Sequence, residues 1–587
     1  MENLEWDLSI IYKTKDDWNN DLEKFQALSN ELLGYKGKLN DKTLFKEFLL
    51  KSRDASLLLN KIFNYAYMKK DLNQKNLDNQ KDLNRVYGIY SEFSQKIAFA
   101  DPEMLSVGKK ILDWCKEDSE IEANLYSLNK LFRLEEHVRS SEVEEVIASL
   151  DSCENDIVKL YDSLAIADNY DVTVTLSNNE KLTVNNSNYR YYLGKLTNQE
   201  DRRIVFEAIF KYYYDHKNTF AGIYNGILDT DYNIAKNKGY ESALACKLFK
   251  ENIDLKVFHS LVETSKENTN LIKRYYELRK KYFKLDELHT YDRFIHLKES
   301  NKKYSYLNSR NMVLEACKKM GDDYYNKALK ALDFGRVSVY PSDGKATGAY
   351  STGTYKEGPY ILLNHTDSLS SAFTIAHECG HSIHTLYANE TQKPETADYV
   401  IFVAEVASTF NEQLFLDYLV ANIDDKDEKI VLLEQAIDDL IATFYRQTLF
   451  ADFEYQAHSM VESGNAVTAD YLSNIMTKLY MEYYDIDLNN EKYKDMVWAS
   501  IPHLFHTPYY VYQYATSYSA SLALYNKVKN GDSNDFAKYI NLLKSGGSND
   551  PVVLIKNAGV DLSTKEPFIE VVKRLEELLN ELEANLA

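Results

Sequence analysis

Cysteine and proline are both scarce in this sequence, with five and eight residues among 587. The cysteines, Cys115, Cys153, Cys246, Cys317 and Cys379, are odd in number, scattered and without a CxxC pair. This usage argues against a disulfide framework and is typical of a reducing compartment. Because only 8 Pro and 20 Gly interrupt the chain, its long apolar-periodic segments predict a mostly α-helical fold.

Positive charge and long apolar runs are also lacking. Lys and Arg total 69 against 90 Asp and Glu, which gives a net charge of −21. Nucleic acid and anionic membranes are therefore unexpected partners, since both require a basic surface. No run of 18 apolar residues exists to span a bilayer, and the acidic N-terminus has no apolar core like that of a signal peptide. We expect a soluble cytoplasmic protein, either a monomer or a weak homo-oligomer.

The chain shows no fixed-period repeat and no low-complexity linker, so its domains must be inferred from local pattern. Residues 15–165 are typical of a succession of long helices. In residues 171–186, apolar and polar residues alternate on both sides of a Ser-Asn-Asn turn, which predicts a β-hairpin. Helical patterns resume near residue 197. We place a boundary near residue 195, between an N-terminal helical domain (1–195) and a second domain (196–587).

The segment with the clearest chemistry is His377-Glu378-Cys379-Gly380-His381. It lies in a predicted helix that Asp367 or Ser368 can cap. Residues four apart on a helix project side by side, so His377 and His381 can bind one Zn²⁺ with Glu378 beside the remaining coordination position. The alternative is a buried helix whose histidines are satisfied by hydrogen bonds.

Zinc requires a third protein ligand. One known solution is the longer motif H-E-x-x-H-x-x-G-x-x-H, whose last histidine is the third ligand. This sequence does not match it, because His384 stands at the glycine position and Tyr387 at the position of the last histidine. We interpret His384 as a structural residue or as a partner of a ligand. Cys379 faces away from both ligands on the helix, so we interpret it as core packing and not as a nucleophile.

Glutamates downstream of the helix are the candidate third ligands. Glu405 lies in an apolar helical stretch, where a carboxylate is costly unless it is paired or bound to a metal. Glu412, seven residues later, falls on the same face and can accept a ligand histidine's N–H. Glu390 and Glu395, in an expected loop, remain alternatives.

Residues 337–364 carry most of the β signal near the motif, broken by glycines into short strands. The stretch Tyr360-ILLN ends just before the helix. We expect it to offer a free edge to an extended peptide, held by main-chain hydrogen bonds. An ordinary packed hairpin is the alternative.

HECGH followed by AEVASTFNE resembles the thimet-oligopeptidase (M3) metallopeptidases, and the oligoendopeptidase F branch most closely. The likeness runs along nearly the whole chain and includes LEWDLSIIY, ATGAYSTGTYKEGPYILLNH and IPHLFHTPYYVYQYATS. The resemblance implies one Zn²⁺ per chain, held by His377, His381 and Glu405, with Glu378 as the catalytic base. The implied fold is an elongated multi-helix ellipsoid with a deep substrate channel and a small sheet beside the zinc helix.

The segment Ile501-PHLFHTPYYVYQYATS supplies candidate donors to the oxyanion that peptide hydrolysis creates. The resemblance points to His503 and one tyrosine. Tyr510 is the first choice, and Tyr509, Tyr512 and Tyr514 remain open.

The resemblance thus implies a zinc endopeptidase that cuts short, unstructured peptides. A zinc carboxypeptidase is a rival and would need a cation for the substrate's C-terminal carboxylate, for which Arg336 and Arg446 are candidates. A peptide-binding protein that has lost catalysis is a second rival, and the intact Glu378 argues against it.

Overall fold

The computed structural model describes residues 4–587, and the chain divides into two compact units. Unit 1 contains the residues up to Glu136 together with Lys302–Ala421 and Leu524–Val560. Unit 2 contains His137–Asn301, Asn422–Ala523 and Asp561–Ala587. We expected a single boundary near residue 195. The six segments instead alternate between the units, because segments distant in sequence complete each core.

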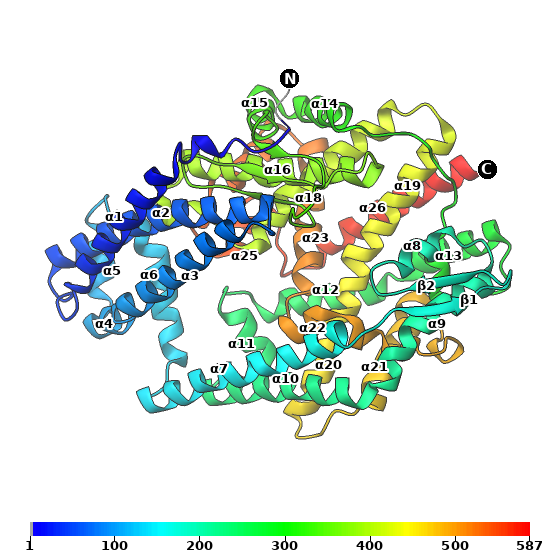
Figure 1. Ribbon diagram of the computed structural model, residues 1–587, viewed down its shortest axis with the longest axis horizontal. Coiled ribbons are helices and arrows are strands. Elements are labelled where there is room, and N and C mark those ends of the chain that lie inside the picture. The colour runs from blue at the N-terminus through cyan, green and yellow to red at the C-terminus, as the bar shows by residue number, and fades with distance from the viewer. Residues whose placement is uncertain (1–3) are drawn as a thin grey trace. The chain divides into compact units, whose positions relative to one another are not determined.

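Unit 1 begins with three long helices that pack on one another (blue in Figure 1). Trp18, Leu22, Phe25 and Leu32 of α1 are buried at intervals of three, four or seven residues, so one face of the helix enters the core. The helices of unit 1 are α1 (Lys15–Leu33), α2 (Lys42–Leu72), α3 (Leu77–Ile97), α4 (Ala100–Val107), α5 (Lys110–Lys116), α6 (Leu125–Leu134), α14 (Tyr306–Cys317), α15 (Asp322–Ala331), α16 (Leu369–Thr391), α17 (Pro394–Ala397), α18 (Ile401–Asn422), α24 (Ser533–Lys544) and α25 (Pro551–Asn557).

A small sheet in unit 1 corrects one of our predictions. Its strands are β3 (Val337–Ser338), β4 (Tyr350–Thr352) and β5 (Tyr360–Leu362), in the order β3-β5-β4. β5 pairs in parallel with β3 and antiparallel with β4, so the Tyr360-ILLN stretch has no free edge. The N-terminus also supports β5, since Trp6 Nε1 donates to the Ile361 carbonyl oxygen at 2.8 Å. The free edge on the β5–β4 side belongs to β4.

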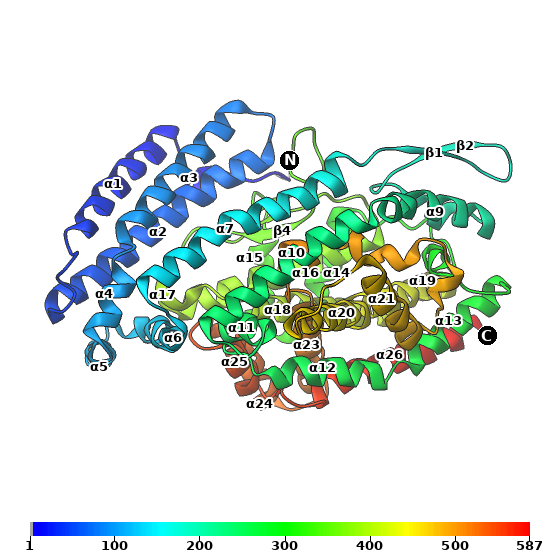
Figure 2. The same cartoon turned by 90° about the horizontal axis from the view of Figure 1, so that it is seen from below.

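Unit 2 is also helical. α7 and α10 run side by side in both views, and α19 packs on α26 (Figures 1 and 2). The expected hairpin forms from β1 (Val172–Thr175) and β2 (Lys181–Val184), paired antiparallel. The helices of unit 2 are α7 (Ser141–Asp162), α8 (Tyr189–Lys195), α9 (Gln199–Asp215), α10 (Lys217–Lys238), α11 (Ala243–Phe249), α12 (Leu255–Glu267), α13 (Asn270–Phe283), α19 (Lys426–Leu440), α20 (Arg446–Glu462), α21 (Ala469–Tyr484), α22 (Pro502–His506) and α26 (Glu566–Leu586). A further helix, α23 (Tyr512–Asn530), begins in unit 2 and ends in unit 1.

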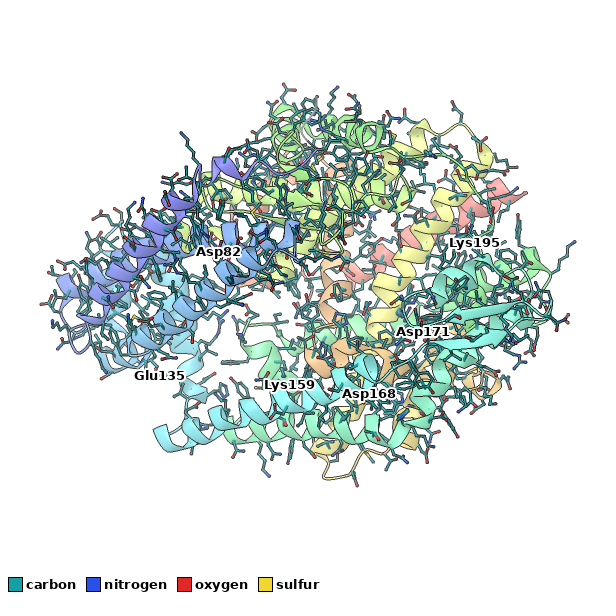
Figure 3. The ribbon with its side chains drawn as sticks, in the orientation of Figure 1. Asp82, Glu135, Lys159, Asp168, Asp171 and Lys195 are labelled. Atoms are coloured by element: carbon teal, nitrogen blue, oxygen red, sulfur yellow. The ribbon has the colours of Figure 1, made fainter. Side chains whose placement is uncertain are left out.

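The prediction of a mostly α fold is confirmed, and two small sheets occur within residues 4–587. Of the six charged residues labelled in Figure 3, Asp82 is partly buried, and Glu135, Lys159, Asp168, Asp171 and Lys195 are exposed. None of the described helices combines the length and the apolar character needed to cross a bilayer.

Candidate metal centre

Three side chains of unit 1 converge where α16 meets α18. His377 Nε2 lies 3.1 Å from His381 Nε2. Glu405 Oε2 lies 3.6 Å from the former nitrogen and 3.9 Å from the latter. Tetrahedral Zn²⁺, with bonds of about 2.0–2.2 Å, needs ligand atoms about 3.4 Å apart. Among the residues that the structure describes, this is the one group of three His, Cys, Asp or Glu side chains close enough to hold a metal ion.

Both histidines are oriented through their second ring nitrogen. His377 Nδ1 lies 2.7 Å from Glu412 Oε1, the contact expected from helical spacing. His381 bonds to the backbone carbonyl of Ala404. The Glu412 contact places an N–H on His377 Nδ1, so that Nε2 carries the lone pair when the ring is neutral, which is the arrangement of metal-binding histidines in proteins. Burial acts to lower the pKa of His377, but the Glu412 hydrogen bond and the negative charges of Glu412, Glu378 and Glu405 together outweigh it and raise the pKa to about 9.

Gly380 allows the two helices to approach closely enough for this geometry. A Cβ atom at residue 380 would lie 2.6 Å from the Ala407 carbonyl oxygen and 2.7 Å from Ser408 Cα. Asn411, which is buried, fastens the same contact because its Nδ2 donates to the Ala376 carbonyl at 2.7 Å. Helical spacing assigns no role to Gly380 or Asn411, which enter the sequence analysis only as members of the segments HECGH and AEVASTFNE. A glycine inside a long helix, which usually has a packing reason, was the available signal.

Glu378 lies beside the three candidate ligands. Its side chain is buried, and its Oε2 has no hydrogen-bond partner. The backbone N–H of Ser351, in β4, donates to the carboxylate. Burial raises the pKa of Glu378 to about 7. A carboxyl group with a pKa near neutrality can both accept and return a proton.

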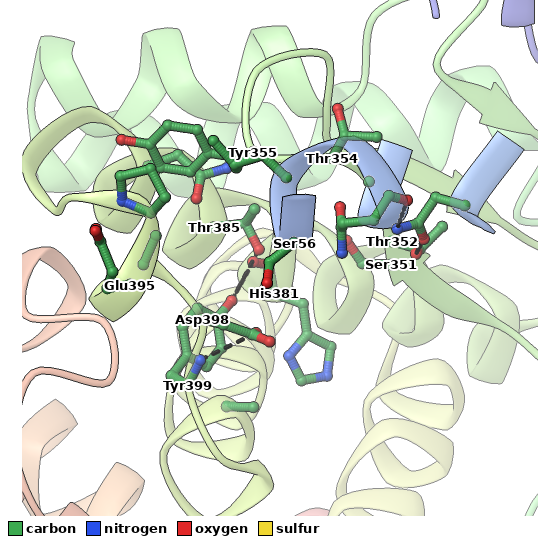
Figure 4. A pocket seen from close by; sticks show the side chains of 18 of the residues that line it. Ser56, Ser351, Thr352, Thr354, Tyr355, His381, Thr385, Glu395, Asp398 and Tyr399 are labelled. Carbon is green, nitrogen blue, oxygen red and sulfur yellow. Dashed lines mark hydrogen bonds between the residues drawn. The ribbon is translucent and has the colours of Figure 1, made fainter. Parts of the chain in front are cut away.

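The candidate ligands and Glu378 line a cavity of about 940 Å³ in unit 1. Side chains of α2 and α17, the start of α18, and strand β4 form the rest of its wall. Figure 4 shows Ser351 and Thr352 of β4 on the same side of the pocket as His381. Thr352 Oγ1 donates to Asn64 Oδ1 at 3.1 Å, which ties the edge strand to α2.

The other residues considered near the motif have different roles. Glu390 pairs with Lys327 at 2.8 Å. Glu395 lines the pocket but is not part of the metal group. His384 is buried and stacks on Tyr399 with ring centroids 3.6 Å apart, and burial lowers its pKa to about 3. Cys379 is buried, in agreement with core packing.

The aromatic segment belongs to unit 2. Tyr509 and Tyr512 are buried in its core, and Tyr509 adopts a positive φ of 60° while its N–H donates to Glu454 at 2.8 Å. Tyr510 and Tyr514 instead gather around His503. The Tyr514 hydroxyl lies 3.5 Å from His503 Nε2, and the Tyr510 ring stacks parallel to the imidazole at 5.9 Å. Of the four tyrosines considered, Tyr510 and Tyr514 are therefore the two that accompany His503.

The chain is similar to known proteins in both sequence and structure. Residues 192–574 match peptidase family M3. The oligopeptidase PepF of Bacillus subtilis is 32% identical over 585 residues, which cover 98% of this chain and 86% of its own. A solved structure from Chlamydophila abortus is similar with a TM-score of 0.90 at 29% identity, covering 99% and 98% of the two chains. The oligoendopeptidase-F structure from Enterococcus faecium has a TM-score of 0.72 at 26% identity, covering 98% and 100%.

We expect Gly380→Ala to weaken Zn²⁺ binding by at least about tenfold, because the new methyl group forces α18 away from α16 at a cost of about 1–3 kcal/mol. Gly88→Ala is the matched control. Gly88 lies in α3 with open space around its Cβ position, so alanine there should be neutral or stabilising by about 0.5–1 kcal/mol. For both variants, thermal unfolding measures the stability, and titration with Zn²⁺ in the presence of a competing chelator measures the affinity. Parent-like binding by Gly380→Ala would contradict the proposed constraint.

We expect Glu405→Ala to lose Zn²⁺ at neutral pH, and Glu412→Ala to weaken binding by about 10–100-fold, the usual cost of losing a carboxylate that orients a ligand histidine. The measurement is the same chelator competition, with Glu390→Ala as a control for charge. If Glu405→Ala binds like the parent, Glu405 is not the third ligand.

Proposed function

Because this chain belongs to peptidase family M3, we propose that it is a zinc endopeptidase that hydrolyses internal bonds of short, unstructured peptides. One observation carries the proposal: His377, His381 and Glu405 converge in a large pocket beside the buried carboxylate of Glu378. Peptide hydrolysis follows from the family. The identity of the metal, the roles of the residues and the size of the substrate are the proposed parts.

We assign His377, His381 and Glu405 to hold one Zn²⁺ per chain, with Glu412 fixing the orientation of His377. Two imidazoles and one carboxylate are a donor set typical of catalytic zinc sites, and their spacing fits tetrahedral bonds. When bound, zinc supplies a Lewis acid that polarises the peptide carbonyl and lowers the pKa of a coordinated water to about 7.

Glu378 is assigned as the general base. Its unpartnered Oε2 takes the proton from the attacking water and then delivers it to the departing amine. The Ser351 N–H holds the carboxylate on the side of the pocket formed by β4.

The edge of β4 is assigned to bind the substrate backbone, in place of the Tyr360-ILLN stretch. β4 lines the pocket, and β5 occupies only one of its two sides. An extended peptide can add to such an edge through main-chain hydrogen bonds, which hold it without regard to its side chains.

His503 and Tyr510 are assigned as donors to the oxyanion of the scissile carbonyl, on the family resemblance. Tyr514 is the alternative to Tyr510, because both tyrosines accompany His503. A fixed donor of this kind is worth about 3 kcal/mol of transition-state stabilisation.

A carboxypeptidase is less well supported. Arg336 Nη1 donates to the Glu357 and Pro359 carbonyl oxygens at 2.6 and 3.4 Å, so it has a structural role. Arg446 lies in α20 of unit 2, and neither arginine lines the pocket. The cytoplasmic location and the monomeric or weakly associating state remain predictions from the sequence.

We expect Glu378→Gln to keep its metal and lose nearly all turnover, by about 10³-fold or more, because the ligands remain while the base is lost. Metal content and hydrolysis of a quenched peptide are measured on the same preparation. Near-parent turnover by the zinc-loaded variant would remove Glu378 from the mechanism.

Peptides of about five to twenty residues, blocked at both ends, should be cut internally, whereas casein and folded proteins should resist. A carboxypeptidase needs a free C-terminal carboxylate and cannot cut a peptide whose ends are blocked. Cleavage of these peptides therefore indicates an endopeptidase. Product masses identify the bonds cut, and Glu378→Gln controls for contaminating proteases. Rapid casein degradation that disappears in Glu378→Gln would contradict the size limit while leaving the zinc chemistry in place.

A further inference from the structure

Glu395, a carboxylate that lines the pocket, has no hydrogen-bond partner. Glu395 lies in α17, its side chain is 10% exposed, and both of its oxygens are buried without a hydrogen-bond donor. The nearest cation is Arg53 of α2, whose Nη1 lies 3.9 Å from Glu395 Oε1, too far for a hydrogen bond. The Nε of Arg53 donates instead to Asp54 at 3.2 Å. A buried carboxylate without a hydrogen-bond donor is costly, so a donor that a ligand brings into the pocket would be stabilised there.

Glu395 and the metal group line different parts of the same pocket. His381, Thr385 and Asn389 are successive turns of α16, and all three line the cavity. The pocket thus follows the helix for about 12 Å beyond His381, at 1.5 Å per residue. Glu395 comes just after this helix ends at Thr391, and Figure 4 shows it apart from His381, with Thr385 and Tyr399 between them. An extended peptide advances about 3.3 Å per residue, so Glu395 is about three or four residues from the reacting bond.

The charges of this part of the pocket favour a cation. Apart from the metal group and Glu378, the charged residues of the lining are Arg53, Glu395 and Asp398. Two carboxylates therefore face one guanidinium. Asp398 is exposed and already accepts the N–H of Tyr399 at 3.1 Å, which leaves Glu395 as the carboxylate with both oxygens open. An ammonium or guanidinium group supplies the missing donors and the opposite charge.

We propose that Glu395 is a specificity residue that binds a positively charged group of the substrate, about three or four residues from the scissile bond. The group is a lysine or arginine side chain or the peptide's own α-ammonium, which share the same chemistry. This inference rests on the proposed function, since it assumes that a peptide occupies the pocket.

The test uses blocked, quenched peptides in which a single lysine is moved through the four positions on each side of the cleaved bond, each paired with a glutamine version. A neutral peptide with a free N-terminus is compared with its acetylated form. For the wild-type enzyme, we expect kcat/KM to be about tenfold higher for the charged member at one position, the worth of one hydrogen bond to a charged group. A preference confined to lysine identifies a side chain as the source, and one confined to the free N-terminus identifies the α-ammonium.

In Glu395→Gln, we expect KM for the charged peptide to rise to that of its neutral partner, so that the preference is lost. Cleavage of the neutral peptides should be unchanged, and this also shows that the variant is folded. Glu390→Gln is the matched control, because it removes an exposed charge from the end of α16 without touching the pocket. Its preference for the charged peptides should equal that of the wild type.

Arg53→Gln separates substrate binding from a structural ion pair. If Glu395 binds a substrate cation, removal of the competing guanidinium strengthens the preference, opposite to Glu395→Gln. If the two residues only stabilise each other, both variants impair all peptides alike, and the proposal is wrong. A wild-type enzyme that cuts the neutral peptides but shows no preference at any position also overturns it and leaves the proposed function standing. A wild-type enzyme that cuts none of the peptides overturns both.

Discussion

The close contact of α16 and α18 at Gly380 is the constraint on which the metal centre depends. Packed helix axes are usually about 8–10 Å apart, a separation set by the side chains between them. Here the missing side chain of residue 380 brings the backbones of the two helices together, with Ala407 and Ser408 against the glycine. Short carboxylate and imidazole side chains can then meet across the gap. Every group of the centre comes from these two helices, at spacings of one turn on α16 and two turns on α18.

The same contact concentrates acidic charge. Glu378, Glu405 and Glu412 lie against two histidines in a largely buried volume, and the neighbouring carboxylates add to burial in raising the pKa of Glu378. Without a metal, protons must balance this charge, and His377 takes one readily. A metal dication balances the negative charge better than protons do. It also accepts the lone pairs of the two imidazole rings, which their hydrogen bonds orient toward the centre. The affinity for a metal is therefore a property of the packed helix pair and not of the motif alone.

Helical periodicity predicts that His377 lies beside His381 and that Glu405 shares a face with Glu412, because all four stand on turns of regular helices, whereas the choice of Glu405 over Glu390 and Glu395 came from the family resemblance. Periodicity failed where pairing or an unusual backbone decides the outcome. Nothing local in the Tyr360-ILLN stretch reveals that β3 and β4 flank it on both sides. Likewise, the positive φ of Tyr509 breaks the regular order of side chains, so the tyrosines that accompany His503 could not be selected from spacing. The interleaved units escaped prediction for a related reason, since their boundaries follow long-range contacts that leave no mark in composition.

The interleaving of the units also sets the order in which the protein can be completed as it is synthesised. Trp6 donates to the carbonyl of Ile361, a partner made 355 residues later. At about 5–20 residues per second, this partner emerges roughly 20–70 s after the tryptophan. Unit 1 is not complete until Val560 has been made. The core around its first helices is drawn almost entirely from residues 6–132, with Ala346, Tyr360 and Leu362 added later, so these helices can pack together early in synthesis. α16 instead packs on α24 (Ser533–Lys544), so the surroundings of the candidate metal centre are completed only late in synthesis.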